Sequence, residues 1–258
     1  MAPLDRARRQ VVLYLPGLDG TGRLLHRQVG LHKRYDVLCE SYPQERAATY
    51  EELAATAAEH LEAAADRPAV ILAESFGGAV GLSLALARPE LVERLVLVNT
   101  FAYFPARLRI RLAAWLGKGL PDKPSNPATR RLRGPFFFSP DIPARERDAW
   151  WDRTGAVPMS AFGRRLGMIA GLDLRARLPA VAAPTLVLTA PDDRIVPPAA
   201  GEDLARRLSR ARLLRVPVGH AALIHPRVDV AELLADAGLW QAAKAAATAA
   251  ASPRSRPG

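Results

Sequence analysis

The sequence has almost no cysteine and no long apolar run. Cys39 is the lone cysteine among 258 residues, which excludes an internal disulfide, and no Cys/His cluster has the spacing of a zinc site. No apolar run reaches the roughly 18 residues of a membrane span, and the N-terminal residues lack the apolar stretch of a secretory signal peptide. We expect a cytoplasmic protein with no cofactor and no metal, and a buried, structural thiol at Cys39.

Acidic residues are scarce in one long segment. Residues 101–183 contain 15 Lys and Arg but only 6 Asp and Glu. The rest of the chain has 21 Lys and Arg and 20 Asp and Glu. The same segment holds 10 of the 16 aromatic residues. A basic and aromatic segment suits an anionic or apolar partner. Its arginines are scattered among prolines and match no nucleic-acid-binding module, so we expect no nucleic-acid partner.

Short apolar runs alternate with helical segments along most of the chain. Strands that alternate with helices of this length pair in parallel through crossover connections. The pattern predicts an α/β fold with a doubly wound, mostly parallel sheet, formed by residues 1–100 and 184–240. The predicted strands are 11–15, 36–40, 69–73, 94–98, 185–189 and 211–216, and the predicted helices are 50–65, 79–87, 199–208 and 224–237.

The alternation stops between residues 100 and 184, in a proline-rich stretch that is too long for a plain loop. We predict an inserted helical cap at 101–183 over one end of the sheet, and a flexible tail at 241–258. The apolar residues of the cap have two interpretations. They form the core of the cap, or some of them line an acyl pocket or touch a lipid surface, with arginines meeting anionic head groups. These residues are Leu108, Leu112, Trp115, Leu116, Phe136, Phe137, Phe138, Trp150 and Trp151, with Arg107 and Arg111 on another helical face.

The segment Ala73-Glu74-Ser75-Phe76-Gly77 lies between a predicted strand and a predicted helix. A serine in a sharp strand-to-helix turn, with small residues two before and two after it, is a nucleophile elbow, written G-x-S-x-G. Ala73 replaces the first glycine. The turn exposes the hydroxyl at the end of the strand, and the helix N-terminus favours negative charge. We predict that Ser75 is a nucleophile; an ordinary serine in a turn is the alternative, and the role of Glu74 stays open.

A serine hydroxyl needs a base, and the base needs a carboxylate that orients it. His220 follows the last predicted strand and a glycine, so we predict that it is the base. His225, beside a proline, is the alternative and is expected to be structural. Asp193 begins a turn after the strand at 185–189 and is the predicted orienting acid, with Asp192 as the alternative.

Ester chemistry also needs donors for the oxyanion of the tetrahedral intermediate. We predict that these donors are the backbone N–H groups of Leu18 and Phe76. Leu18 lies in a loop with three glycines, which let a backbone approach a ligand closely. A phosphate-binding loop is the alternative, but the segment lacks the Gly-Lys-Ser/Thr ending of such loops.

The segments LPGLDGTG, ESFGG, PDDRIVP and GH together resemble the α/β-hydrolase superfamily over nearly the whole chain. The resemblance implies a triad of Ser75, Asp193 and His220, with the amides of Leu18 and Phe76 as oxyanion hole. Up to Phe104, the chain is similar to the hydrolase-like half of plant plastid phytyl ester synthases and to related bacterial esterases, on the segments LPGLDGTGRLLHRQ, YDVLCESYP and LAESFGGAVGLSLALARPELVERLVLVNTFAYF. That similarity implies an acyl-ester substrate.

We therefore expect a serine hydrolase that cleaves carboxylic esters of small-molecule or lipid substrates through an acyl-enzyme on Ser75. Two alternatives stay open. An acyltransferase would use the same triad to move a fatty acyl group to an alcohol, and a non-catalytic protein would keep the fold as a ligand pocket. The basic cap adds the expectation of peripheral contact with an anionic membrane surface.

Overall fold

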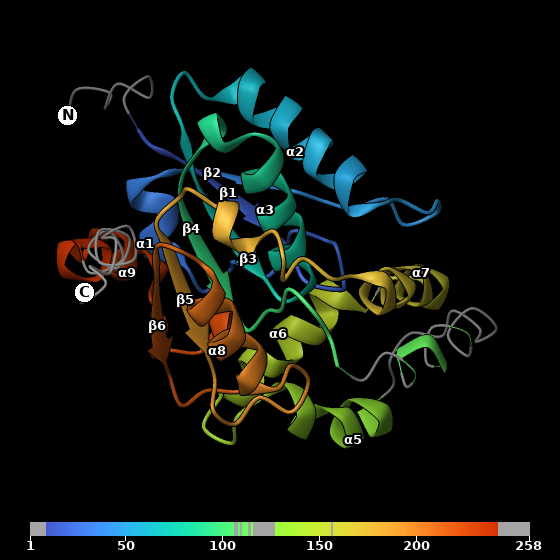
Figure 1. Cartoon of the computed structure of the whole chain (residues 1–258). Coiled ribbons are helices and arrows are strands. Elements are labelled where there is room, and N and C mark those ends of the chain that lie inside the picture. Colours follow the sequence, from blue (N-terminus) through green and yellow to red (C-terminus); the bar gives the residue numbers. More distant parts are fainter. Residues whose placement is uncertain are drawn as a thin grey trace, which may run out of the picture.

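The six predicted strands form one parallel sheet in the computed structural model, which describes residues 9–105, 108, 110–112, 115, 127–155 and 157–241. The strand order is β2-β1-β3-β4-β5-β6 (Figure 1). The predicted α/β fold class is confirmed. The strands are β1 (Val11–Leu15), β2 (Asp36–Cys39), β3 (Ala69–Glu74), β4 (Val92–Val98), β5 (Thr185–Thr189) and β6 (Ala211–Arg215).

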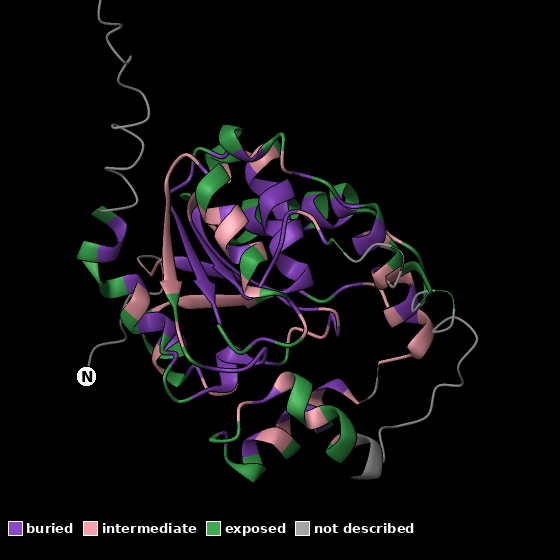
Figure 2. Cartoon of the chain, turned by 60° about the horizontal axis from the view of Figure 1, so that its bottom comes forward, coloured by how far each residue is buried: buried purple, intermediate pink, exposed green. Residues whose placement is uncertain are grey.

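Helices cover both faces of the sheet because successive strand residues point to opposite faces and both sets are apolar. In β1, Leu13 and Leu15 pack in one core with α2 (Tyr50–Ala64), α3 (Phe76–Ala87) and α8 (Pro198–Arg207). Val12 and Tyr14 pack in a second core with α1 (Val29–Arg34) and α9 (Val230–Ala235). Figure 2 shows the buried strands enclosed by helices with exposed outer faces.

The connections place two loops at the point where the winding of the sheet reverses. From β1 the chain goes to β2 on one side, and then returns to β3 on the other side of β1. The loops after β1 and β3 therefore diverge at the carboxyl ends of adjacent strands. In doubly wound sheets, such a switch point is where ligands bind.

The predicted helix at 224–237 is wrong in its first half. A short 3-10 turn, η4 (Ala222–Ile224), is followed by an irregular segment, and α9 begins only at Val230. The Asp229 side chain accepts hydrogen bonds from the first N–H groups of α9 and so fixes its start. The buried Gln28 side chain bonds the backbone of Leu223, Val228 and Val230, which holds the segment in an irregular path.

Cys39 is exposed, so the predicted buried thiol is wrong. The sequence around it is apolar enough for a strand, but β2 lies at the edge of the sheet, where fewer neighbours cover its side chains. The helix α1 was not predicted from the sequence. It has only six residues, and no side chain caps its N-terminus.

The inserted segment between β4 and β5 forms helices α5 (Pro127–Phe137), α6 (Ala144–Thr154) and α7 (Met159–Gly171). Figure 1 shows these helices near the carboxyl ends of the strands. The two ends of the insertion pair with each other, because Leu174 N–H donates to Ala102 C=O at 2.9 Å. Arg107, Leu116 and residues 242–258, which belong to the predicted cap and tail, lie outside the described residues.

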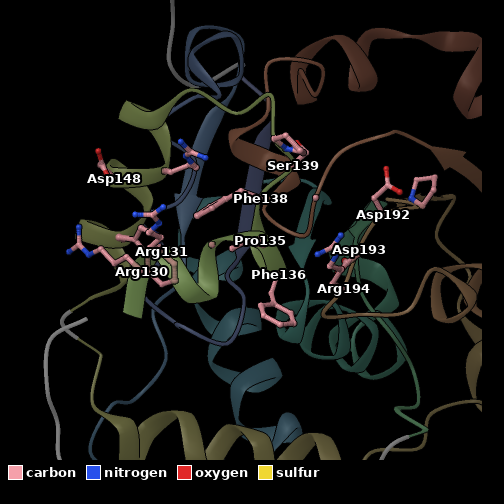
Figure 3. A pocket seen from close by; sticks show the side chains of 16 residues that line it. Arg130, Arg131, Pro135, Phe136, Phe138, Ser139, Asp148, Asp192, Asp193 and Arg194 are labelled. Atoms are coloured by element: carbon pink, nitrogen blue, oxygen red, sulfur yellow. The ribbon is translucent and has the colours of Figure 1, made fainter. Parts of the chain in front are cut away.

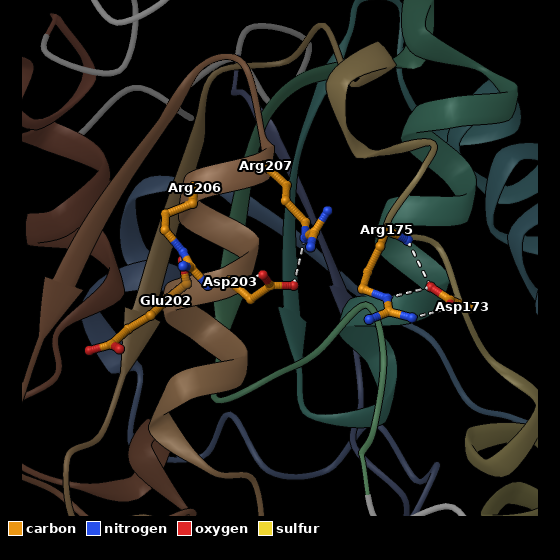
Figure 4. A network of polar contacts seen from close by, with 6 residues as sticks. All are labelled: Asp173, Arg175, Glu202, Asp203, Arg206 and Arg207. Carbon is orange, nitrogen blue, oxygen red and sulfur yellow. Dashed lines mark hydrogen bonds and ion pairs between the residues drawn. The ribbon is translucent and has the colours of Figure 1, made fainter.

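Several arginines pair with acids close in sequence. Asp203 of α8 bonds Arg206 at 3.0 Å and Arg207 at 2.8 Å, and Asp173 bonds Arg175 at 2.6 Å (Figure 4). Exposed pairs of this kind contribute only a few tenths of a kcal/mol to about 1 kcal/mol each. Within the described part of the chain, no helix has both the length and the apolar character needed to cross a bilayer.

The first turn of α3 packs directly on the end of β1, and this contact gives a testable prediction. A Cβ on Gly77 would overlap the carbonyl oxygen of Leu15, whereas a Cβ on Gly167 of α7 would have no neighbour within 4 Å. We expect Gly77→Ala to lower the free energy of unfolding by about 3 kcal/mol or more, because backbone atoms cannot yield easily. Gly167→Ala should be neutral or stabilise by up to about 1 kcal/mol. Urea denaturation of both variants checks this, and equal stabilities would contradict it.

Candidate active site

Ser75 occupies a strained turn between β3 and α3. Its φ is 52° and its ψ is −118°, a left-handed conformation that residues other than glycine rarely adopt. The turn is held by the Ser75 N–H, which donates to Val98 C=O at 2.9 Å, and by the Thr100 hydroxyl, which donates to Ser75 C=O. Strain of this kind persists only where surrounding contacts enforce it, and it is frequent at functional sites.

The structure brings Ser75, His220 and Asp193 together from three separate loops. His220 Nε2 lies 3.1 Å from Ser75 Oγ, and His220 Nδ1 lies 2.7 Å from Asp193 Oδ2. All three residues are buried. Asp192, the alternative acid, is exposed, and His225, the alternative base, lies 3.1 Å from Asp141 of the cap.

The Asp193 carboxylate is fixed on both sides. Its Oδ1 accepts hydrogen bonds from the N–H groups of Ile195 and Val196, at 2.7 Å and 2.9 Å. Its Oδ2 faces the imidazole. Because neither oxygen is free to turn, the carboxylate holds His220 with Nδ1 toward Asp193 and Nε2 toward the serine.

Asn99 joins the loops that carry the acid and the base, a role that the sequence did not reveal. It follows β4, has a positive φ of 46° and is 2% exposed. Its amide nitrogen donates to the carbonyls of Gly219 and His220 at 3.2 Å and 3.0 Å, and its amide oxygen accepts from Ala190 N–H at 2.9 Å. A polar residue at the carboxyl end of a buried strand was the available signal.

The predicted oxyanion-hole donors lie beside the serine. A Cβ on Gly17 would be 3.6 Å from Ser75 Cβ, which places the Gly17–Leu18 peptide next to Ser75. Phe76 follows Ser75 and is the first residue of α3. Neither the Leu18 N–H nor the Phe76 N–H donates a hydrogen bond to another described residue. Two N–H groups are therefore available to a ligand at this point.

Arg165 of α7 connects the cap to the loop that carries Leu18. This arginine is 4% exposed and donates to four carbonyl oxygens rather than to a carboxylate. Two of them belong to Leu18 and Asp19, at 2.8 Å and 3.0 Å, and the others to Tyr42 and Pro43, at 3.4 Å and 3.1 Å. The guanidinium thus fixes the two peptide groups on either side of Asp19.

A cavity of about 340 Å³ opens over Ser75 and His220, a size that suits a small-molecule ligand. Its walls come from the sheet loops and from the cap, and they are mainly apolar. The first interpretation of the cap aromatics holds for Trp150 and Trp151, which are buried in an aromatic cluster; both residues also line the cavity. The aromatic lining residues are Phe101, Phe104, Phe137, Trp150, Trp151 and Phe162.

A second, wider depression of about 1140 Å³ lies between α5 and the loop that contains Asp193 (Figure 3). Its lining includes Arg130, Arg131 and Arg194, but not Ser75. Among the described residues, no three His, Cys, Asp or Glu side chains gather as a metal site would require.

Comparison with known proteins shows the family, since the model of the alpha/beta hydrolase family matches residues 1–233. The chain belongs to the alpha/beta hydrolase family. Such hydrolases carry their nucleophile on a strand-to-helix elbow, where the chain has Ser75.

Individual relatives of this hydrolase include enzymes of two reaction types. It is 28% identical to the "Putative carbamate hydrolase RutD" of Yersinia enterocolitica, over 83% of this chain and 81% of the relative. It is 32% identical to the pimeloyl-(acyl-carrier protein) methyl ester esterase of Aromatoleum aromaticum, over 65% of this chain and 73% of the relative. The esterase EaEST of Exiguobacterium antarcticum shares its fold, with a TM-score of 0.77, 17% identity and coverage of 88% and 90% of the two chains.

Glu74 directly precedes Ser75 in the chain and also lines the cavity. It is 4% exposed, and the Tyr14 hydroxyl donates to its Oε2 at 2.7 Å. Burial raises the pKa of Glu74 to about 7, since the loss of hydration outweighs the Tyr14 hydrogen bond and the attraction of His220. A second acid, Asp19, lines the same cavity.

The raised pKa of Glu74 gives a prediction for the pH dependence of stability. Because the folded protein binds this proton more tightly than the unfolded chain, the contribution of Glu74 to stability is complete below pH 4.5 and is lost as the pH rises through 7. Glu74→Gln removes this titration. From pH 5 to pH 8, we expect the free energy of unfolding of the wild type to fall by about 2 kcal/mol or more relative to that of Glu74→Gln. Urea denaturation at both pH values measures it; a stability difference that does not change with pH would contradict the prediction.

Proposed function

We propose that the protein hydrolyses carboxylic esters through an acyl-enzyme on Ser75. The observation that carries the proposal is the chain of contacts from Ser75 Oγ to His220 Nε2 at 3.1 Å and from His220 Nδ1 to Asp193 at 2.7 Å, at the floor of an apolar cavity. A hydroxyl in contact with an oriented imidazole is an activated nucleophile. Asp193 would stabilise the imidazolium that forms.

In the first step, Ser75 Oγ attacks the ester carbonyl carbon and its proton passes to His220 Nε2. The carbonyl oxygen becomes an oxyanion, which the N–H groups of Leu18 and Phe76 would bind. Each such donor lowers the barrier by about 3 kcal/mol in related chemistry. The tetrahedral intermediate then breaks the bond to the alcohol oxygen, and His220 returns the proton to the leaving alkoxide.

In the second step, water takes the place of the alcohol. His220 accepts a proton from the water as the water oxygen attacks the acyl carbon. The bond between the acyl carbon and Ser75 Oγ then breaks, and His220 returns the proton to Ser75 Oγ. The products are a carboxylic acid, an alcohol and the free hydroxyl of Ser75. The apolar cavity walls would bind the acyl chain and limit the access of bulk water.

The relatives support ester chemistry at this site. Their names describe the hydrolysis of a methyl ester and of a carbamate, and both substrates present a carbonyl carbon to a nucleophile. Transfer of the acyl group to an alcohol, the kinship with phytyl ester synthases, a cytoplasmic location and contact with an anionic membrane stay predictions from the sequence.

Loss of the nucleophile tests the proposal directly. We expect Ser75→Ala to abolish labelling by a fluorophosphonate probe and hydrolysis of p-nitrophenyl esters, because no other hydroxyl contacts His220 in the described residues. Asp193→Asn should lower kcat by about 1000-fold or more, whereas Asp192→Asn, the matched control, should stay within about threefold of the wild type. Labelling that survives in a folded Ser75→Ala variant would overturn the assignment.

The Arg165 contacts predict an effect on turnover from outside the triad. Lysine cannot reach four carbonyls, so Arg165→Lys should loosen the Leu18 loop and lower kcat by about 10- to 100-fold, with a smaller change in KM. The control is Arg164→Lys, since Arg164 contacts Gln44 C=O and not the Leu18 loop. Steady-state kinetics on one ester checks both variants, and equal kcat values would contradict this role of Arg165.

A further inference from the structure

The cavity over Ser75 contains one residue that an apolar acyl pocket does not need. Arg133 of α5 is the one Lys or Arg among the described residues that line it. Its guanidinium carbon lies 5.5 Å from the ring centre of Trp151 and 5.9 Å from that of Phe137. Contact with two aromatic faces positions the planar group and leaves its N–H donors at the edges.

Arg133 forms no ion pair with a carboxylate of the described residues, whereas neighbouring arginines do. Arg130 lies 2.9 Å from Asp152, and Arg145 lies 3.3 Å from Glu146. Partial burial lowers the pKa of Arg133, since its charged form has lost hydration. Its side chain nevertheless remains accessible from solvent. An incoming anion would find N–H donors that no acid of the described residues occupies.

The position of Arg133 relative to the triad limits where such an anion could bind. Phe137 lies between the Arg133 guanidinium and the His220 imidazole. The ring centre of Phe137 is 6.1 Å from that of His220 and 5.9 Å from the guanidinium carbon of Arg133. The guanidinium and the imidazole are therefore no more than about 12 Å apart. Near the serine, the Asp19 carboxylate and the ionised form of Glu74 would repel an anion. A substrate with its ester at Ser75 and an anionic group at Arg133 satisfies both conditions.

We propose that Arg133 binds a carboxylate of the substrate, so that the protein prefers esters that carry a second, anionic group remote from the scissile carbonyl. This inference rests on the proposed hydrolysis at Ser75. A carboxylate matches a single planar guanidinium through two parallel hydrogen bonds. A phosphate dianion would need more positive charge than one guanidinium supplies.

The test compares matched esters with and without the carboxylate. On the acyl side, monomethyl esters of dicarboxylic acids from succinic to sebacic acid are paired with methyl esters of monocarboxylic acids of equal length. On the alcohol side, acetyl esters of ω-hydroxy acids are paired with acetyl esters of simple alcohols. The readout is the ratio of kcat/KM for the charged ester to that for the neutral ester.

For the wild type, we expect this ratio to exceed about 10 at one chain length, in one of the two arms. Arg133→Gln should reduce the ratio by at least tenfold, and Arg133→Lys should give an intermediate value because it keeps the charge but not the two-pronged geometry. Arg131→Gln is the matched control, since Arg131 is exposed on the same helix and does not line this cavity. The control should keep the wild-type ratio.

A wild-type ratio near one in both arms, or a ratio that Arg133→Gln leaves unchanged, would overturn the role of Arg133 while ester hydrolysis still stands. Absence of turnover with every ester would count against the proposed function instead. Calorimetric binding of the charged esters to Ser75→Ala, with and without Arg133→Gln, tests the anion site in that case. Equal affinities of the two proteins for the charged esters would overturn the anion site, and tighter binding by the protein that keeps Arg133 would support it.

Discussion

The strained turn at Ser75 is the constraint on which the site depends. Ser75, with its positive φ between β3 and α3, directs its hydroxyl toward His220. The same turn makes Phe76 the first residue of α3, so the Phe76 N–H has no partner within the helix. The turn requires backbones to approach closely. A Cβ on Gly77 would overlap the end of β1, and a Cβ on Gly78 would overlap the Thr100 side chain. The site therefore depends on these two glycines as much as on Ser75.

The other parts of the site are held by polar groups that bind backbone rather than substrate. Asn99 ties the Ala190 and His220 loops to the end of β4, and Arg165 ties the Leu18 loop to the cap. Each group is buried and bonds several backbone atoms at once. Loops that are already held in place lose little conformational freedom when a transition state binds. Such preorganisation of hydrogen-bond donors is what makes electrostatic stabilisation effective. The cap is thus linked to the candidate site through Arg165 as well as through the walls of the cavity.

The sequence predicted the sheet and the elbow because their patterns are local. Short apolar runs marked all six strands, and small residues around Ser75 marked the turn. The features that it missed depend on distant partners. Gln28 holds the segment before α9 from nearly 200 positions away in the sequence, and the exposure of Cys39 follows from the position of β2 at the sheet edge. The roles of Asn99 and Arg165 are likewise visible only once separate loops meet.

The central claim is that Ser75 carries the acyl group during turnover. Rapid mixing with a p-nitrophenyl ester, followed by acid quench, proteolysis and mass spectrometry of the peptides, tests it most directly. We predict a burst of p-nitrophenol of about one equivalent per protein chain when deacylation is the slower step, with the acyl mass on the peptide that contains Ser75. A burst with no acyl adduct on any peptide, or an adduct on a different residue, would contradict it.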